Sequence, residues 1–149
     1  MKMWSVVSGQ GSVTGAIGVT FCLLLSQWAC SIPNLESQQC SEARDSVKEF
    51  YSWYLGTDPE QRNKQPEVFK KYLSASLLTN ASGETDPFFN SATPPTTFKI
   101  GKCEMVDTTH TNIQVQLYWR EGPKTDQKEV YADTVKNGDR WQIEKIENR

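Results

Sequence analysis

The sequence contains one histidine among 149 residues, no Cys-x-x-Cys pair, and no apolar run long enough to span a membrane comfortably as a helix. A single histidine and widely separated cysteines give no support for a zinc site or a thioredoxin-like redox centre. The 16 basic and 18 acidic residues are scattered, so the chain lacks the basic patch that nucleic-acid binding requires. We therefore predict no metal, no cofactor and no nucleic-acid partner.

An apolar segment at residues 16–25 lies close to the N-terminus and is typical of the central region of an export signal. Ala29 and Cys30 follow it, and a small residue before a cysteine is typical of the cleavage and lipidation site of bacterial lipoproteins. We predict a signal peptide over 1–29, lipidation of Cys30, and a tether over 30–40. This predicts an exported protein, anchored to a membrane of the bacterial cell envelope or periplasm. Ordinary signal cleavage and an uncleaved anchor are the alternatives.

The four cysteines divide at this boundary. Cys22 lies in the predicted leader and Cys30 is the predicted lipidation site, which leaves Cys40 and Cys103. Disulfides persist in oxidising compartments, so export favours a Cys40–Cys103 bond between the start of the first helix and the first long strand. Closing a loop of that separation would stabilise the fold by about 4 kcal/mol in the chain-entropy account. The alternative is two separate buried thiols, which behave as small apolar side chains.

Apolar residues recur with a helical period after the predicted tether. Ser41 is a suitable N-cap and Gly56 a suitable stop, so we predict a helix between them. Its apolar face consists of Ala43, Val47, Phe50, Tyr51, Tyr54 and Leu55. A polar loop over 57–65 follows, then a second helix opened by Pro66 and a short third helical turn. Residues 80–97 are rich in Asn, Ser, Thr and Pro, which predicts a long loop.

The pattern then changes to the two-residue alternation of half-buried strands. The expected strands run from Phe98 toward Met105, over 113–120, over 130–136, and over 140–146. A turn over 107–112, a connection beginning at Glu121 and an Asn137-Gly138 hairpin separate them. This order predicts an α+β domain over 41–149, with two or three N-terminal helices packed on one face of a curved, mainly antiparallel sheet of about four strands.

Four motifs of this chain are Phe50-Tyr51-x-Trp53-Tyr54, Leu73-x-x-x-Leu77-Leu78, Asp86-Pro87-Phe88 and Val135-x-x-x-x-x-Trp141-x-Ile143-x-x-Ile146. Together they resemble a DUF3828-like family of small exported bacterial domains of unknown function. That family is placed in the NTF2-like, or cystatin-like, superfamily. The resemblance spans residues 43–147 and implies a cone-shaped domain whose sheet wraps around the first helix and whose open end can form a pocket. Because this superfamily includes enzymes, binding modules and dimerising scaffolds, the fold assigns no function.

Residues able to carry catalysis are few. His110 lies in the polar stretch 107–112, where a solvated turn residue is the favoured interpretation. The resemblance implies that an enzyme of this superfamily would hold an Asp or His deep in the cone. Asp86, at the expected pocket mouth, and Asp133, on the expected strand 130–136, are therefore the catalytic candidates. Asp86 also precedes a proline, which favours a turn-forming role.

Aromatic residues are the candidates for a ligand pocket. They are Tyr51, Tyr54, Trp119, Tyr131 and Trp141. Packing in the core is the favoured alternative, because large aromatic side chains dominate small cores.

Our preferred hypothesis is a non-catalytic cell-envelope protein that binds a small apolar ligand or a protein partner, with a lipid anchor at Cys30. The alternative is an isomerase- or hydratase-like enzyme, with Asp86 or Asp133 as an inward base of raised pKa and Tyr54 as proton donor. A third hypothesis is a homodimer formed through the outer sheet face. The side chains expected to point from that face are Gln114, Gln116, Tyr118 and Arg120.

Overall fold

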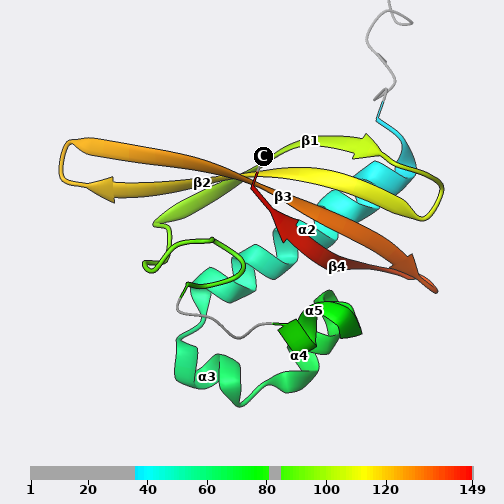
Figure 1. The fold of residues 1–149 in the computed structure, drawn as a ribbon, viewed down its shortest axis with the longest axis horizontal. Coiled ribbons are helices and arrows are strands. Elements are labelled where there is room, and N and C mark those ends of the chain that lie inside the picture. Colours follow the sequence, from blue (N-terminus) through cyan, green and yellow to red (C-terminus); the bar gives the residue numbers. More distant parts are fainter. Residues whose placement is uncertain (1–35, 81–84, 149) are drawn as a thin grey trace, which may run out of the picture. The chain divides into compact units, whose positions relative to one another are not determined.

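The computed structural model describes residues 36–80 and 85–148. Within these residues the elements, labelled in Figure 1, are α2 (Gln38–Gly56), α3 (Pro59–Asn63), α4 (Pro66–Tyr72), α5 (Ala75–Asn80), β1 (Thr97–Met105), β2 (His110–Glu121), β3 (Lys124–Asn137) and β4 (Arg140–Glu147). The strands form one antiparallel sheet in the order β1-β2-β3-β4, and α2 lies along one of its faces. The predicted α+β fold is confirmed. The predicted leader, the Cys30 site and most of the tether lie outside the described residues.

Helix α2 begins four residues earlier than its sequence pattern suggested. Ser37, rather than Ser41, is the N-cap, and its hydroxyl oxygen accepts a hydrogen bond from the amide of Cys40 at 3.2 Å. The buried residues of α2 repeat with the expected period and face the sheet; they are Cys40, Ala43, Val47, Phe50, Tyr51 and Tyr54. Gly56 ends the helix, as predicted. Within the described ranges, no helix has both the length and the apolar character needed to cross a membrane.

The short helix α3 lies where the sequence predicted only a polar loop. Arg62 anchors this helix to α2: its guanidinium lies 3.8 Å from the centre of the Tyr54 ring and donates to the Tyr54 carbonyl oxygen at 3.0 Å. Five residues with no apolar face give no periodic signal, so the sequence pattern could not reveal this helix. Helix α4 opens at Pro66, as predicted.

Helices α4 and α5 cover the free edge of β4. The amide of Ser74 donates to the carbonyl oxygen of Ile143 at 2.9 Å, and the Gln142 side chain donates to the carbonyl oxygen of Lys70 at 2.8 Å. Leu73 also forms an isolated bridge with Ile143. The bond from Ser74 satisfies a backbone carbonyl of β4 that an open edge strand would expose to pairing with another chain, and the bond from Gln142 ties this edge to α4.

The β2–β3 hairpin is longer than predicted. Strand β3 starts at Lys124, directly after a two-residue turn in which Gly122 has φ +60°, so the expected strand start at residue 130 is wrong. The extra stretch, Lys124 to Glu129, is polar on both faces and lacks the alternation of a half-buried strand. The predicted hairpin at Asn137-Gly138 is confirmed, with Gly138 at φ +63°.

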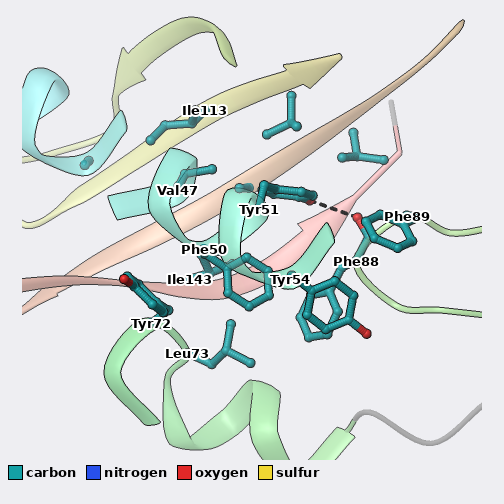
Figure 2. Packing of buried hydrophobic residues seen from close by; sticks show 14 of the residues in the cluster. Val47, Phe50, Tyr51, Tyr54, Tyr72, Leu73, Phe88, Phe89, Ile113 and Ile143 are labelled. Carbon is teal, nitrogen blue, oxygen red and sulfur yellow. Dashed lines mark hydrogen bonds between the residues drawn. The ribbon is translucent and has the colours of Figure 1, made fainter. Parts of the chain in front are cut away.

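The core lies between α2 and the inner face of the sheet, as Figure 2 shows. Ile113, Val115 and Leu117 of β2 are fully buried there, in the two-residue alternation expected of a half-buried strand. Phe88 and Phe89, from the loop before β1, pack against the aromatic residues of α2. A loop segment therefore contributes two of the largest side chains in this core.

The disulfide predicted between Cys40 and Cys103 is confirmed. Its two Cα atoms are 5.8 Å apart, and it joins the first turn of α2 to β1 across 63 residues. Cys103 follows a register shift in the β1–β2 pairing, between Ile100 and Cys103. The bond therefore fixes the helix to an edge strand whose ladder is irregular at that point.

Removing this disulfide should lower the free energy of unfolding by about 4 kcal/mol, because the unfolded chain regains the entropy of an open 63-residue loop. The comparison is urea unfolding of the full chain with and without the paired substitutions Cys40→Ser and Cys103→Ser. Adding reductant should destabilise the parent protein and leave the double variant unchanged. Equal stability of the oxidised parent and the double variant would contradict this account.

Candidate functional site

The space between α2 and the sheet is filled by aromatic rings. Phe50 and Tyr51 are completely buried, and Phe88 and Phe89 are nearly so. The Tyr51 hydroxyl donates to the carbonyl oxygen of Phe88 at 2.8 Å, which is the dashed line in Figure 2. Two of the predicted pocket residues, Tyr51 and Tyr54, thus lie in this packed core, as the alternative interpretation of the aromatics expected.

Asp86, the first catalytic candidate, accepts hydrogen bonds from other residues of the domain on both of its carboxylate oxygens. Its Oδ2 accepts a 2.7 Å hydrogen bond from the Tyr54 hydroxyl, and its Oδ1 accepts a 2.9 Å bond from the Phe88 amide. Its backbone carbonyl accepts from the amide of Asn90 at 2.7 Å, and its amide donates to the carbonyl of Ser91 at 3.2 Å. The predicted turn-forming role is confirmed, and Asp86 also clamps the loop to α2.

Tyr54 is a poor proton donor in this setting. Burial raises its pKa, and the hydrogen bond to the Asp86 carboxylate raises it further by favouring the protonated phenol. Burial likewise raises the pKa of Tyr51, with the charge of Asp86 as the next cause. Both hydroxyl protons are therefore held by the fold more tightly than in a free tyrosine, which is the reverse of what proton donation at neutral pH requires.

Asp133 and Tyr131 lie on the outer face of the sheet. Their neighbours Val130 and Ala132 are fully buried on the inner face, and successive residues of a strand point to opposite faces. The Asp133 carboxylate accepts a hydrogen bond from the side chain of Asn112, on the adjacent strand. The expectation that Asp133 could face inward, and that Tyr131 could line an interior pocket, is therefore corrected by the strand register.

His110 begins β2 at an exposed turn. Its Nδ1 lies 2.9 Å from Oδ2 of Asp107, and hydrogen bonds from Thr109 and then from His110 lower the Asp107 pKa to about 2. The side chain is solvent-exposed, as predicted, but His110 is the first residue of β2, so the predicted turn over 107–112 ends earlier than expected. Across residues 36–80 and 85–148, no three His, Cys, Asp or Glu side chains form a group that could hold a metal ion.

A groove runs along the solvent face of α2, a region that the sequence analysis did not single out. We call it the α2 groove. It comprises two adjoining hollows of about 590 Å³ and 320 Å³ that share Asp45, Glu49 and Tyr72. The other lining residues are Glu42, Ser46, Lys48, Ser52, Trp53, Lys71, Asp139, Arg140 and Trp141.

Two aromatic residues form the floor of the α2 groove, and each is bonded to an acid of α2. The Tyr72 hydroxyl donates to Glu49 at 2.9 Å, and the Trp141 indole N–H donates to Glu42 at 3.2 Å. Both rings are less than a tenth exposed. The bond from Tyr72 is the leading cause of the lowered pKa of Glu49. The pKa of Glu42 is lowered first by a hydrogen bond from Gln38 and then by the bond from Trp141.

A lysine accompanies each of these pairs. The Lys71 ammonium lies 4.4 Å from the Tyr72 ring centre and 3.3 Å from Glu49. Lys136 lies 5.7 Å from the Trp141 ring centre and 3.4 Å from Glu42. Each acid is thus neutralised locally.

Asp45 lies between these two clusters and differs from them. It is exposed and lines both hollows, and its side chain makes no hydrogen bond or ion pair with any residue that the structure describes. Glu42, Asp45 and Glu49 follow one another at i, i+3 and i+7 on one helix face, which was the signal available in the sequence. The walls that α4 and the β3–β4 hairpin contribute to the groove could not be predicted from that pattern.

Trp119, the remaining pocket candidate, points inward from β2 but lies near the end of the β2–β3 hairpin. It is half-buried, and its indole N–H donates to the carbonyl oxygen of Thr93 at 3.0 Å. It lines a shallow pocket at the hairpin and does not belong to the α2 groove.

Comparison with known proteins informs the fold alone. A solved structure of a protein of unknown function from Bacteroides thetaiotaomicron is similar, with a TM-score of 0.51 and 11% sequence identity over 87% of this chain and 96% of that chain. No family model and no curated protein matches the sequence.

Breaking the Tyr54–Asp86 bond should be costly. We expect Tyr54→Phe to lower the free energy of unfolding by about 2 kcal/mol, because a hydrogen bond to a charged acceptor is lost in a partly buried setting. Tyr72→Phe, which removes a hydroxyl bonded to the exposed Glu49, is the matched control, and we expect a loss of at most about 1 kcal/mol. Urea unfolding measures both, and equal losses would refute the clamp.

Stability should also fall steeply in alkali. Tyr51 and Tyr54 have pKa values raised in the fold above the ordinary value of 10, so above pH 10 the unfolded chain releases protons that the folded chain retains. Each tyrosine should then cost about 1.4 kcal/mol per pH unit as the pH rises. Unfolding curves between pH 9 and 11 test this, and a Tyr51→Phe variant should show a shallower slope; an unchanged slope would count against it.

Proposed function

We propose that this chain is a non-catalytic, exported domain of the DUF3828-like type within the NTF2-like superfamily, held at the cell envelope by a lipid at Cys30. It uses the α2 groove to bind an extended segment of a partner protein. The observation that carries the proposal is the unpaired Asp45 between two neutralised acid–lysine pairs over an aromatic floor.

The absence of catalysis is supported by how the candidate residues are used. Asp86 has both oxygens engaged by Tyr54 and Phe88, and Asp133 faces outward beside Asn112. A small apolar ligand in the interior would have to displace the buried rings of Phe50 and Tyr51. The interior therefore favours the partner-protein alternative over the small-ligand one.

The dimensions of the groove suit a short peptide. Glu42 and Trp53 are eleven residues apart on α2, which is about 16 Å along a helix and matches about five residues of extended chain. A basic residue of the segment would meet Asp45, the one acid in the row that the fold leaves without a cation. The half-buried Trp53 at the end of the row would contact an apolar side chain of the same segment.

A seven-residue peptide library displayed on phage tests the proposal against the full chain. Enriched peptides should carry a lysine or arginine, and their synthetic forms should bind about tenfold more weakly to Asp45→Asn and to Asp45→Arg than to the parent. Asp126→Asn, which changes an equally exposed acid on the hairpin, is the control and should bind normally.

Calorimetry at two salt concentrations completes this experiment, because an exposed ion pair weakens as salt rises. Peptides enriched without basic residues, or affinities indifferent to Asp45, would refute the proposed mode of binding.

A further inference from the structure

The β2–β3 hairpin carries a second concave surface, which shares no residue with the α2 groove. We call it the hairpin pocket. It has a volume of about 290 Å³ and lies between the inner face of the hairpin, which projects beyond α2 in Figure 1, and the loop that precedes β1. Its lining residues are Asn90, Ser91, Thr93, Trp119, Glu121, Asp126, Gln127 and Lys128.

The two walls of the hairpin pocket are fixed to each other. The Trp119 indole N–H donates to the Thr93 carbonyl at 3.0 Å, and the Lys128 ammonium donates to the Asn90 carbonyl at 2.6 Å. Asn90 has φ +48°, a left-handed conformation that asparagine tolerates better than most residues. A pocket built before any ligand arrives loses little conformational entropy on binding.

The groups of the hairpin pocket that a ligand can contact are an apolar ring and the hydrogen-bond donors and acceptors around it. The indole N–H of Trp119 is already engaged, so this side chain offers a ligand its ring surface. The carboxylates of Glu121 and Asp126 and the side-chain amide of Asn90 form no bond elsewhere in residues 36–80 and 85–148. Lys128 uses one of its three donors on Asn90.

We propose that the hairpin pocket binds one ring of a neutral or amino-substituted carbohydrate. A sugar ring has an apolar C–H face, which packs on an indole, and a rim of hydroxyl groups that both donate and accept hydrogen bonds. Two carboxylates against one ammonium disfavour phosphorylated or acidic sugars. The small volume and the open surface fit a single ring of a longer glycan.

The test uses the full chain and two sources of carbohydrate. Calorimetric titration with cellotetraose, maltotetraose, xylotetraose and chitotetraose examines soluble glycans, and co-sedimentation with purified peptidoglycan sacculi examines cell-wall glycan. We expect binding in at least one arm, reduced about tenfold by Trp119→Ala and largely retained in Trp119→Phe.

Asp126→Asn provides a variant that should fold normally, because Asp126 is exposed and unbonded. It should weaken binding severalfold with an unchanged unfolding midpoint, whereas Asp45→Asn in the α2 groove should leave glycan binding unaltered. Binding to sacculi alone would identify cell-wall glycan as the source, and binding to a tetrasaccharide would identify a soluble glycan. Absence of binding in both arms, or binding indifferent to Trp119 and Asp126, would overturn the proposal.

Discussion

Asp86 connects the loop before β1 to helix α2, a part of the fold that is distant in the sequence. Its side chain accepts from Tyr54 on α2, and its backbone pairs with Asn90 and Ser91 to close the loop. That loop delivers Phe88 into the core, where its ring lies 4.9 Å, centre to centre, from both Phe50 and Tyr54. Without the carboxylate, the Tyr54 hydroxyl would lose its acceptor and the loop would lose its side-chain clamp. The aromatic core therefore depends on a polar contact at its border.

The same contact keeps the carboxylate of Asp86 engaged within the fold. A carboxylate acts as a base only when one of its oxygen lone pairs faces the proton that it removes from the substrate. Here Tyr54 and Phe88 occupy both oxygens of Asp86, and Phe50 and Tyr51 fill the adjoining space. The carboxylate of Asp86 and the space beside it are thus both taken up by contacts within the fold, and the two binding sites proposed above lie on outer surfaces.

Local sequence patterns predicted much of the fold. The period of Ala43, Val47 and Phe50 predicted α2, and Gly138 predicted the last hairpin, because each depends on near neighbours in the chain. The patterns failed where tertiary contacts decide the outcome: α3 is held by Arg62 on Tyr54, and the polar start of β3 is paired only because β2 lies beside it. The candidate sites follow the same division. The acids of α2 are visible in the sequence, but the pairing of Trp119 with Thr93 joins segments 26 residues apart and has no local signal.

The two surfaces proposed for binding share a physical property that distinguishes them from the clamp. Asp45 and Asp126 are exposed and their side chains form no hydrogen bond within the described residues, whereas both carboxylate oxygens of Asp86 accept one. Substitutions at exposed, unbonded positions usually change stability by less than about 0.5 kcal/mol. A large effect of changing Asp45 or Asp126 on binding would therefore come from lost contacts with the bound molecule, not from lost stability. In this fold, burial separates the residues that maintain the structure from those free to recognise something outside it.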